Sequence, residues 1–256
     1  MRLASIVPGA FAEHVLTEED DYHLLIAPEV IDNQPYREFY RGRGTSGDFI
    51  ILDNGAYEVH AYEEEVDLSP TALEAAVDAL GFLPSEIVLP DVPGSAHETL
   101  LRSTKAAYYL RERWRYSVFM VVPHGTTLEE YLACAQYMVE LPGLQSFGVS
   151  FIAADAIGIS REELVKRLLE SIRKIDPDIH LLGYRDPVPP ETKDVCRGID
   201  TAKHVRMAIE GFFLDKADPV IKCGPRPSDF FRNDNLNPEL MDAVAQNITI
   251  FREHLA

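Results

Sequence analysis

The sequence predicts an α/β protein that forms one (β/α)8 TIM-type barrel. Short aliphatic and β-branched runs alternate with longer segments of helical period, and eight strand candidates follow one another along the chain. The chain has 256 residues, 46% of them hydrophobic, so it can bury one large core as a single domain. An open doubly wound sheet is the alternative, because the first and eighth strands are weakly marked. We therefore expect one barrel over residues 1–256, in which residues 211–256 form a C-terminal lip and a closing helix.

The expected elements are bounded by capping and turn residues. The strand candidates cover residues 2–7, 22–27, 48–52, 85–89, 116–122, 146–151, 179–183 and 198–201. The clearest helices cover residues 69–80, 96–114, 127–141, 161–175 and 238–255. Ser69 can cap the first of these helices, and Ser160 with Glu163 three residues later has the capping-box pattern. The proline-rich segment 185–191 is expected to be a loop.

Charge and cysteine content limit the classes of protein to consider. The 42 acidic residues outnumber the 24 basic ones, and the net charge of -18 argues against broad electrostatic binding of nucleic acid. No stretch of eighteen apolar residues occurs, and the first residues turn polar too early for a signal peptide, so a soluble cytoplasmic protein is expected. Cys134, Cys196 and Cys223 lie far apart and form no CxxC pair, so neither a disulfide framework nor a zinc knuckle is expected.

Three aspartates lie at the ends of expected strands. Asp53 follows the third strand in LDNGAYE, Asp91 follows the fourth in LPDVPG, and Asp200 lies in the eighth in RGIDT. The reacting groups of such barrels lie at the C-terminal ends of the strands, so we expect the three carboxylates at one mouth. A single aspartate would be interpreted as a helix cap or a turn former. Three crowded carboxylates acquire separated pKa values, which lets one act as a nucleophile while another transfers a proton.

Other residues at the same mouth have two interpretations each. His124 lies in a loop after the fifth strand and is either a ligand contact or a turn residue, whereas His180 is expected to pack within its strand. Gly148 and Gly183 let a flat ligand approach the backbone, or they are simple turn residues.

Six motifs in order along the chain resemble those of the tRNA-guanine transglycosylase superfamily. They are ILDNGAYE, VLPDVPGS, FMVVPHG, FGVS, HLLG and RGIDT, and the likeness runs from about residue 22 to residue 231. It is greater to the viral branch, which inserts 7-deazaguanine bases into DNA. The resemblance implies a glycosyltransferase that exchanges guanine for a 7-deazaguanine by double displacement at C1′ through a covalent aspartyl intermediate. Its implied partners are DNA and a free 7-deazaguanine base, its implied location is the host cytoplasm, and no cofactor or metal is implied.

The resemblance also implies roles for individual residues. Asp53 corresponds to an acid–base catalyst, Asp200 to the nucleophile, and Asp91 to a carboxylate that holds the guanine-like edge of the base. The implied substrate contacts besides Asp91 are Asn54, His124, Gly148, Ser150, Gly183 and Arg185. Arg226 and Arg232 lie in loops that can reach the mouth, and they either contact the nucleic acid or are surface arginines in ordinary ion pairs.

Two departures from the family pattern keep other interpretations open. The family's zinc site of clustered cysteines and a histidine has no equivalent, and Lys203 stands where the tRNA enzymes carry their nucleophilic aspartate. One alternative is a tRNA-guanine transglycosylase, which the missing zinc ligands disfavour. Another is a non-catalytic barrel that binds a purine or nucleoside, or that serves as a subunit of a catalytic partner.

Overall fold

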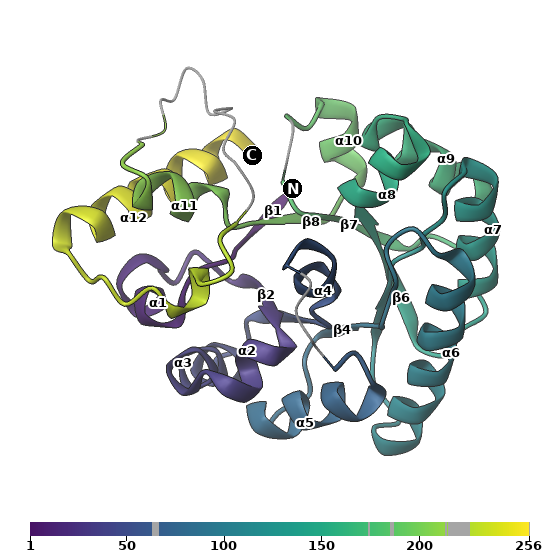
Figure 1. The fold of residues 1–256 in the computed structure, drawn as a ribbon, viewed down its shortest axis with the longest axis horizontal. Helices are drawn as coiled ribbons and strands as arrows, with labels where there is room; N and C mark the ends of the chain where they lie inside the picture. Colours follow the sequence, from purple (N-terminus) through teal and green to yellow (C-terminus); the bar gives the residue numbers. More distant parts are fainter. Residues whose placement is uncertain (63–66, 174, 185–186, 213, 215–225, 256) are drawn as a thin grey trace.

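Eight parallel strands form a nearly closed barrel in the computed structural model (Figure 1), which describes residues 1–62, 67–173, 175–184, 187–212, 214 and 226–255. The strands are β1 (Arg2–Ser5), β2 (Tyr22–Ile26), β3 (Phe49–Asp53), β4 (Glu86–Val88), β5 (Phe119–Val121), β6 (Leu144–Ser150), β7 (Asp178–Leu182) and β8 (Gly198–Thr201). Their order in the sheet is β1-β8-β7-β6-β5-β4-β3-β2, and β1 also lies beside β2. The predicted (β/α)8 barrel is therefore confirmed, and the open doubly wound sheet is excluded.

Helices surround the barrel and cover its outer face. They are α1 (Gly9–Val15), α2 (Ala27–Asp32), α3 (Gln34–Thr45), α4 (Ala56–Tyr62), α5 (Pro70–Leu80), α6 (Ala96–Arg113), α7 (Leu128–Met138), α8 (Phe151–Ile157), α9 (Arg161–Ser171), α10 (Pro190–Val195), α11 (Lys203–Ile209) and α12 (Pro238–Leu255), with a 3-10 turn, η1, at Phe230–Arg232. Helix α12 packs against α1 and α11. Helix α4, which directly follows β3, lies over the middle of the ring in Figure 1.

Most element boundaries differ from the predicted ones by a few residues. Ser69 and Ser160 cap α5 and α9 through their side-chain oxygens, as the sequence predicts. The fifth strand is shorter than predicted, because Ser117 donates its backbone N–H to Trp114 in a turn that leaves the Tyr116 side chain 80% exposed. The prediction of a loop through residue 191 is wrong at its end, because α10 begins at Pro190, a residue that suits the first helical turn.

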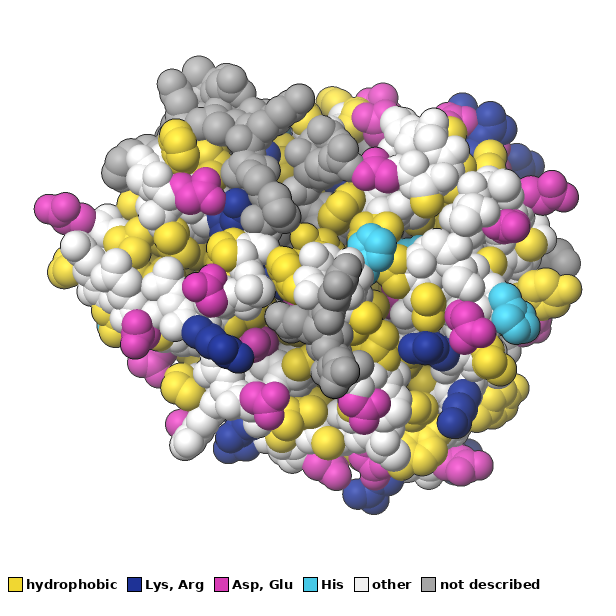
Figure 2. All heavy atoms as spheres, in the orientation of Figure 1, with side chains coloured by type: hydrophobic (Ala, Val, Ile, Leu, Met, Phe, Trp, Pro, Cys, Tyr) yellow, Lys and Arg dark blue, Asp and Glu magenta, His cyan; other side chains and the backbone are white. Residues whose placement is uncertain are grey.

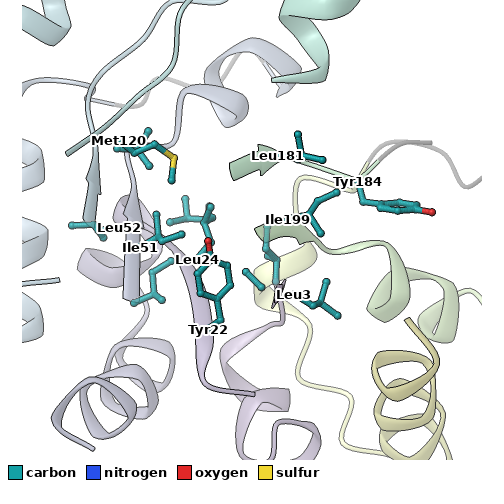
Figure 3. Close-up of a cluster of buried hydrophobic side chains, with 14 of the residues drawn as sticks. Leu3, Tyr22, Leu24, Ile51, Leu52, Met120, Leu181, Tyr184 and Ile199 are labelled. Atoms are coloured by element: carbon teal, nitrogen blue, oxygen red, sulfur yellow. The ribbon is translucent and has the colours of Figure 1, made fainter. Parts of the chain in front are cut away.

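Small residues inside the barrel make room for large ones. A Cβ atom on Gly198 would lie 2.5 Å from the ring of Tyr22, and one on Gly148 would lie 2.7 Å from the Leu182 side chain. Figure 3 shows Tyr22 and Leu24 of β2 beside Ile51 of β3 in the buried cluster. The expectation that Gly148 lets a ligand approach the backbone is therefore corrected: that space is filled by the barrel's own side chains.

Negative charge does not gather at one place on the face of the molecule seen in Figure 2. Acidic side chains are scattered across the face seen in Figure 2, with Lys and Arg side chains between them. No helix within the described residues combines the length and the apolar character needed to cross a membrane.

A buried histidine of α11 predicts a loss of stability in acid. His204 is fully buried beside Phe251, and burial lowers the pKa of His204 to about 3, so its imidazole stays neutral in the folded state. Unfolded chains take up a proton on histidine near pH 6.5, so the free energy of unfolding falls as the pH drops below that value. At pH 5 this penalty is roughly 2 kcal/mol relative to pH 8.

We expect His204→Leu to remove most of this acid sensitivity. Urea unfolding measures how the free energy of unfolding changes between pH 8 and pH 5. We expect that change to favour the folded state by about 2 kcal/mol more in His204→Leu than in the wild type. Replacement of the exposed His14 by Gln is the control and should show the same change as the wild type. Equal pH dependence in the His204 variant and the wild type would contradict the assignment.

Candidate active site

A cavity of about 590 Å³ opens at the C-terminal mouth of the barrel. Three carboxylates from different strands line it: Asp53 at the end of β3, Asp91 in the loop after β4, and Asp200 in β8. All eight strands run parallel, so the residues that end them share one rim. The structure thus brings together the three aspartates that the sequence places at strand ends.

Asp91 is held by donors on both oxygens. Its Oδ1 accepts a hydrogen bond from the Asn54 side-chain amide at 2.8 Å, and its Oδ2 lies 2.8 Å from His124 Nε2. Asn54 is itself fixed, because its amide also donates to the Leu89 carbonyl at 2.9 Å and its Oδ1 accepts from the Ala56 backbone at 2.7 Å. The loops after β3, β4 and β5 are therefore joined around one buried carboxylate.

Asp200 is held from the other side of the pocket. Its Oδ1 accepts from the Gly183 backbone N–H at 3.0 Å and lies 3.1 Å from His180 Nε2. Gly183 has a φ of 73°, a conformation that favours glycine, and this bend after β7 aims its N–H at the carboxylate. Among the described residues, no hydrogen bond reaches the second oxygen, Oδ2, of Asp200.

Asp53 differs from both neighbours because no side chain among the described residues donates a hydrogen bond to it. Its one side-chain hydrogen bond within the described chain is a long one, 3.4 Å, from the Gly55 backbone. Burial is the main cause that raises the pKa of Asp53 to about 7, and the negative charges of Asp91 and Asp200 contribute to the same rise. Near neutral pH this carboxyl group therefore exists in both its protonated and its charged form.

Three basic side chains also belong to the pocket lining, beside many apolar ones. Arg226, before η1, forms a buried ion pair with Glu58 of α4, and its guanidinium lies 4.7 Å from the centre of the Phe231 ring. Lys203 and Arg206 of α11 also line the cavity, and the Lys203 ammonium lies 5.2 Å from the centre of the Tyr184 ring. The lining thus holds both carboxylates and cations, which suits a small polar ligand.

The other predicted site residues fall into three groups. Ser150, Gly183, His124 and Arg226 line the same cavity as the aspartates. Asn54 and Arg232 line a neighbouring groove of about 710 Å³. Gly148 lies inside the barrel and not in the lining, as described above, and Arg185 lies outside the described residues.

Sequence reasoning missed several residues of the pocket. Glu58 and Tyr57 lie on α4, just after the DNG motif that ends β3. Their position close to a strand end was the available signal that they belong to the pocket. His180 was expected only to pack within β7, but it also contacts Asp200. The alternation of side chains along β7 could have revealed this, because His180 and Leu182 point to the same face of the strand and Leu182 lines the cavity.

No group of three or more His, Cys, Asp and Glu side chains in the described part of the chain is arranged to hold a metal ion. Within that part of the chain, the histidines of the pocket region instead make hydrogen bonds to carboxylates, His124 to Asp91 and His180 to Asp200.

The fold and the carboxylate-lined mouth define the class as a (β/α)8 barrel with a polar pocket at its C-terminal end. No protein-family model matches the chain, and neither does any curated protein sequence. An HpcH/HpaI aldolase/citrate lyase family protein from Burkholderia cenocepacia J2315 has a similar structure, with a TM-score of 0.53 at 12% identity, over 82% of this chain and 93% of that one. A variant of the citrate synthase SbnG has a TM-score of 0.48 at 12% identity, over 82% and 88% of the two chains.

This similarity requires a correction. The expectation of a DNA guanine transglycosylase, with a tRNA-guanine transglycosylase as its alternative, is overturned, because the similar Burkholderia barrel is named as an HpcH/HpaI aldolase/citrate lyase family protein and not as a glycosyltransferase. At 12% identity the likeness establishes the shared barrel fold and no more. Acidic residues at the strand ends of a barrel do not by themselves specify a reaction, because one fold hosts many chemistries. The expected partners, DNA and a free 7-deazaguanine, remain predictions.

Proposed function

We propose that this barrel is an acid–base enzyme of the lyase class, in which Asp53 transfers the proton during cleavage or formation of a bond next to a carbonyl group. The observation that carries the proposal is the position of Asp53, whose pKa is raised to about 7 inside a polar cavity. A general acid–base group works best when its pKa lies near the working pH. The aldolase/citrate lyase name of the structurally similar Burkholderia protein supports the reaction class.

The chemistry needs one group that takes a proton and returns it. In the cleavage direction, the charged form of Asp53 removes the proton of a substrate hydroxyl, the electron pair becomes a carbonyl bond, and the adjacent carbon–carbon bond breaks. The carbanion that leaves is stabilised as an enolate by its own carbonyl, and it then takes the proton back from Asp53. No oxidant or reductant is consumed.

The neighbours of Asp53 fit this role. Asp91 and Asp200 are held in position by hydrogen-bond donors. Burial is the main cause of the raised pKa of Asp53, and the charges of these two carboxylates are the next largest causes. Lys203 in the lining places a positive charge beside the carboxylates, as an anionic substrate such as a 2-oxo acid requires, whereas the charge of Arg226 is paired with Glu58.

Proton exchange in heavy water tests the proposal without knowledge of the natural substrate. Pyruvate, 2-oxobutanoate and oxaloacetate are incubated with the protein in D2O, and loss of the signal of the protons next to the carbonyl is followed by NMR. We expect exchange faster than without protein, and a loss of about 10²- to 10⁴-fold in Asp53→Asn, the usual contribution of a general acid–base group.

The rate should also depend on ionisation near pH 7, because Asp53 acts as a base only in its charged form. Glu253→Gln on α12 is the control and should exchange at the wild-type rate. Exchange that persists in Asp53→Asn, or no exchange with any of the three acids, would refute the proposal.

A further inference from the structure

We infer that Tyr22 and His180 are positioning residues, which hold Asp200 through a one-way chain of hydrogen bonds that starts at Arg197. The inference rests on the proposed function in one respect, that Asp200 belongs to the reacting pocket. The chain of hydrogen bonds itself lies in the barrel interior and does not depend on the proposed reaction. It runs from the N-terminal end of the barrel towards the mouth, through residues that the sequence did not assign to the site.

The chain has three links between four side chains. Arg197 Nε donates to Tyr22 Oη at 3.3 Å, Tyr22 Oη lies 2.8 Å from His180 Nδ1, and His180 Nε2 lies 3.1 Å from Asp200 Oδ1. His180 is fully buried and Tyr22 is 2% exposed. Gly198 makes the arrangement possible, because any side chain there would collide with the Tyr22 ring.

The direction of every link follows from Arg197. A guanidinium donates hydrogen bonds and cannot accept them, so the Tyr22 oxygen must be the acceptor of the first link. The hydroxyl proton of Tyr22 is then available for His180 Nδ1, and no other acceptor contacts it among the described residues. A buried hydroxyl without an acceptor would cost about 1–3 kcal/mol, so Tyr22 donates to Nδ1.

The histidine tautomer is thereby determined. Because Nδ1 accepts, the imidazole carries its proton on Nε2 and donates it to Asp200. Burial raises the pKa of Tyr22, so this hydroxyl keeps its proton at any ordinary pH. The pKa of Arg197 is also raised: burial lowers it, but the hydrogen bonds to Glu86 outweigh that effect. Arg197 and Tyr22 are thus each fixed in one protonation state.

The consequence lies at Asp200. Two donors, His180 Nε2 and the Gly183 N–H, hold the same oxygen Oδ1, which fixes the plane of the carboxylate. The other oxygen is left for the pocket. The charge of Asp200 contributes to the raised pKa of Asp53, and this contribution depends on the distance between the two carboxyl groups. The chain of hydrogen bonds fixes that distance because it holds Asp200 in place.

NMR of the imidazole nitrogens tests the chain without any enzymatic assay. The protein has eight histidines, and the His180 signals are assigned as those missing in His180→Gln. We expect the wild type to show His180 protonated on Nε2 alone, and Tyr22→Phe to show both tautomers. The matched control is Tyr131→Phe, which should leave the His180 signals unchanged. It also removes a buried hydroxyl, but that hydroxyl has no hydrogen-bond partner among the described residues.

The exchange assay separates positioning from mere stability. Tyr22→Phe should lower kcat about ten- to hundredfold with KM nearly unchanged. In metalloproteins, removal of the side chain that orients a metal-bound histidine has an effect of about this size. His180→Gln keeps a donor towards Asp200 and should retain more activity than His180→Leu, at equal melting temperature.

The two hypotheses fail in different ways. A wild-type His180 protonated on Nδ1, or a tautomer unaffected by Tyr22→Phe, overturns the positioning chain whatever the protein catalyses. An absence of exchange with the expected tautomer present refutes the lyase proposal alone. Full exchange activity in Tyr22→Phe and His180→Leu removes the positioning role.

Discussion

Replacement of Asp53 by asparagine is expected to stabilise the folded protein at pH 8 by about 2–3 kcal/mol more than at pH 5. The carboxyl group has a pKa of about 7 in the folded state, whereas an unfolded chain has the ordinary value of 3.8. Between these values the folded state binds the extra proton, so the free energy of unfolding falls as the pH rises from about 4 to about 7. Asparagine keeps the shape of the side chain without the charge, and so it removes that loss.

Urea unfolding of the wild type and Asp53→Asn at pH 5 and pH 8 measures the effect. The exposed Asp242 on α12 provides the control, because Asp242→Asn should change both free energies of unfolding by less than about 0.5 kcal/mol. An equal effect of Asp53→Asn at the two pH values would mean that the group is charged throughout, and it would also remove the basis of the proposed function. A variant that is more stable but inactive is the outcome expected of a strained active site.

Replacement of Arg197 by methionine is expected to cost about 3–5 kcal/mol of stability. Its guanidinium contacts both oxygens of Glu86, at 2.7 and 2.6 Å, and Glu86 is 1% exposed. Without its partner the Glu86 carboxylate would be left buried, with only the Ser146 hydroxyl at 2.9 Å among the described residues to compensate. The loss therefore comes mainly from an uncompensated charge.

Two comparisons make this expectation specific. Arg167→Met removes an exposed ion pair with Glu163 on α9 and should cost at most about 0.5 kcal/mol. The double variant Arg197→Met with Glu86→Gln should recover much of the loss, because no buried charge remains. A loss in Arg197→Met no larger than in Arg167→Met would show that water reaches Glu86 in solution.

Much of the fold and part of the site could be predicted from the sequence, for a local reason. Alternating aliphatic strands and helical segments, with capping residues such as Ser69 and Ser160, are short-range patterns. Asp53, Asp91 and Asp200 could be placed at one mouth because parallel strands share their C-terminal rim. The reaction could not be predicted in the same way, since a barrel with acidic strand ends is compatible with many chemistries.

The amino-acid sequence by itself determined the barrel, the order of its elements and the acidic residues at its mouth, because each depends on local periodicity or on position along a strand. Only the tertiary structure decided which groups act on one another. Asn54 and His124 hold Asp91, whereas Asp53 has no such side-chain donors in the described part of the chain and a pKa near 7, and Tyr22 reaches His180 across the barrel. These contacts join residues as far as 158 positions apart. Their energies depend on burial and distance, which the packing of the whole barrel sets.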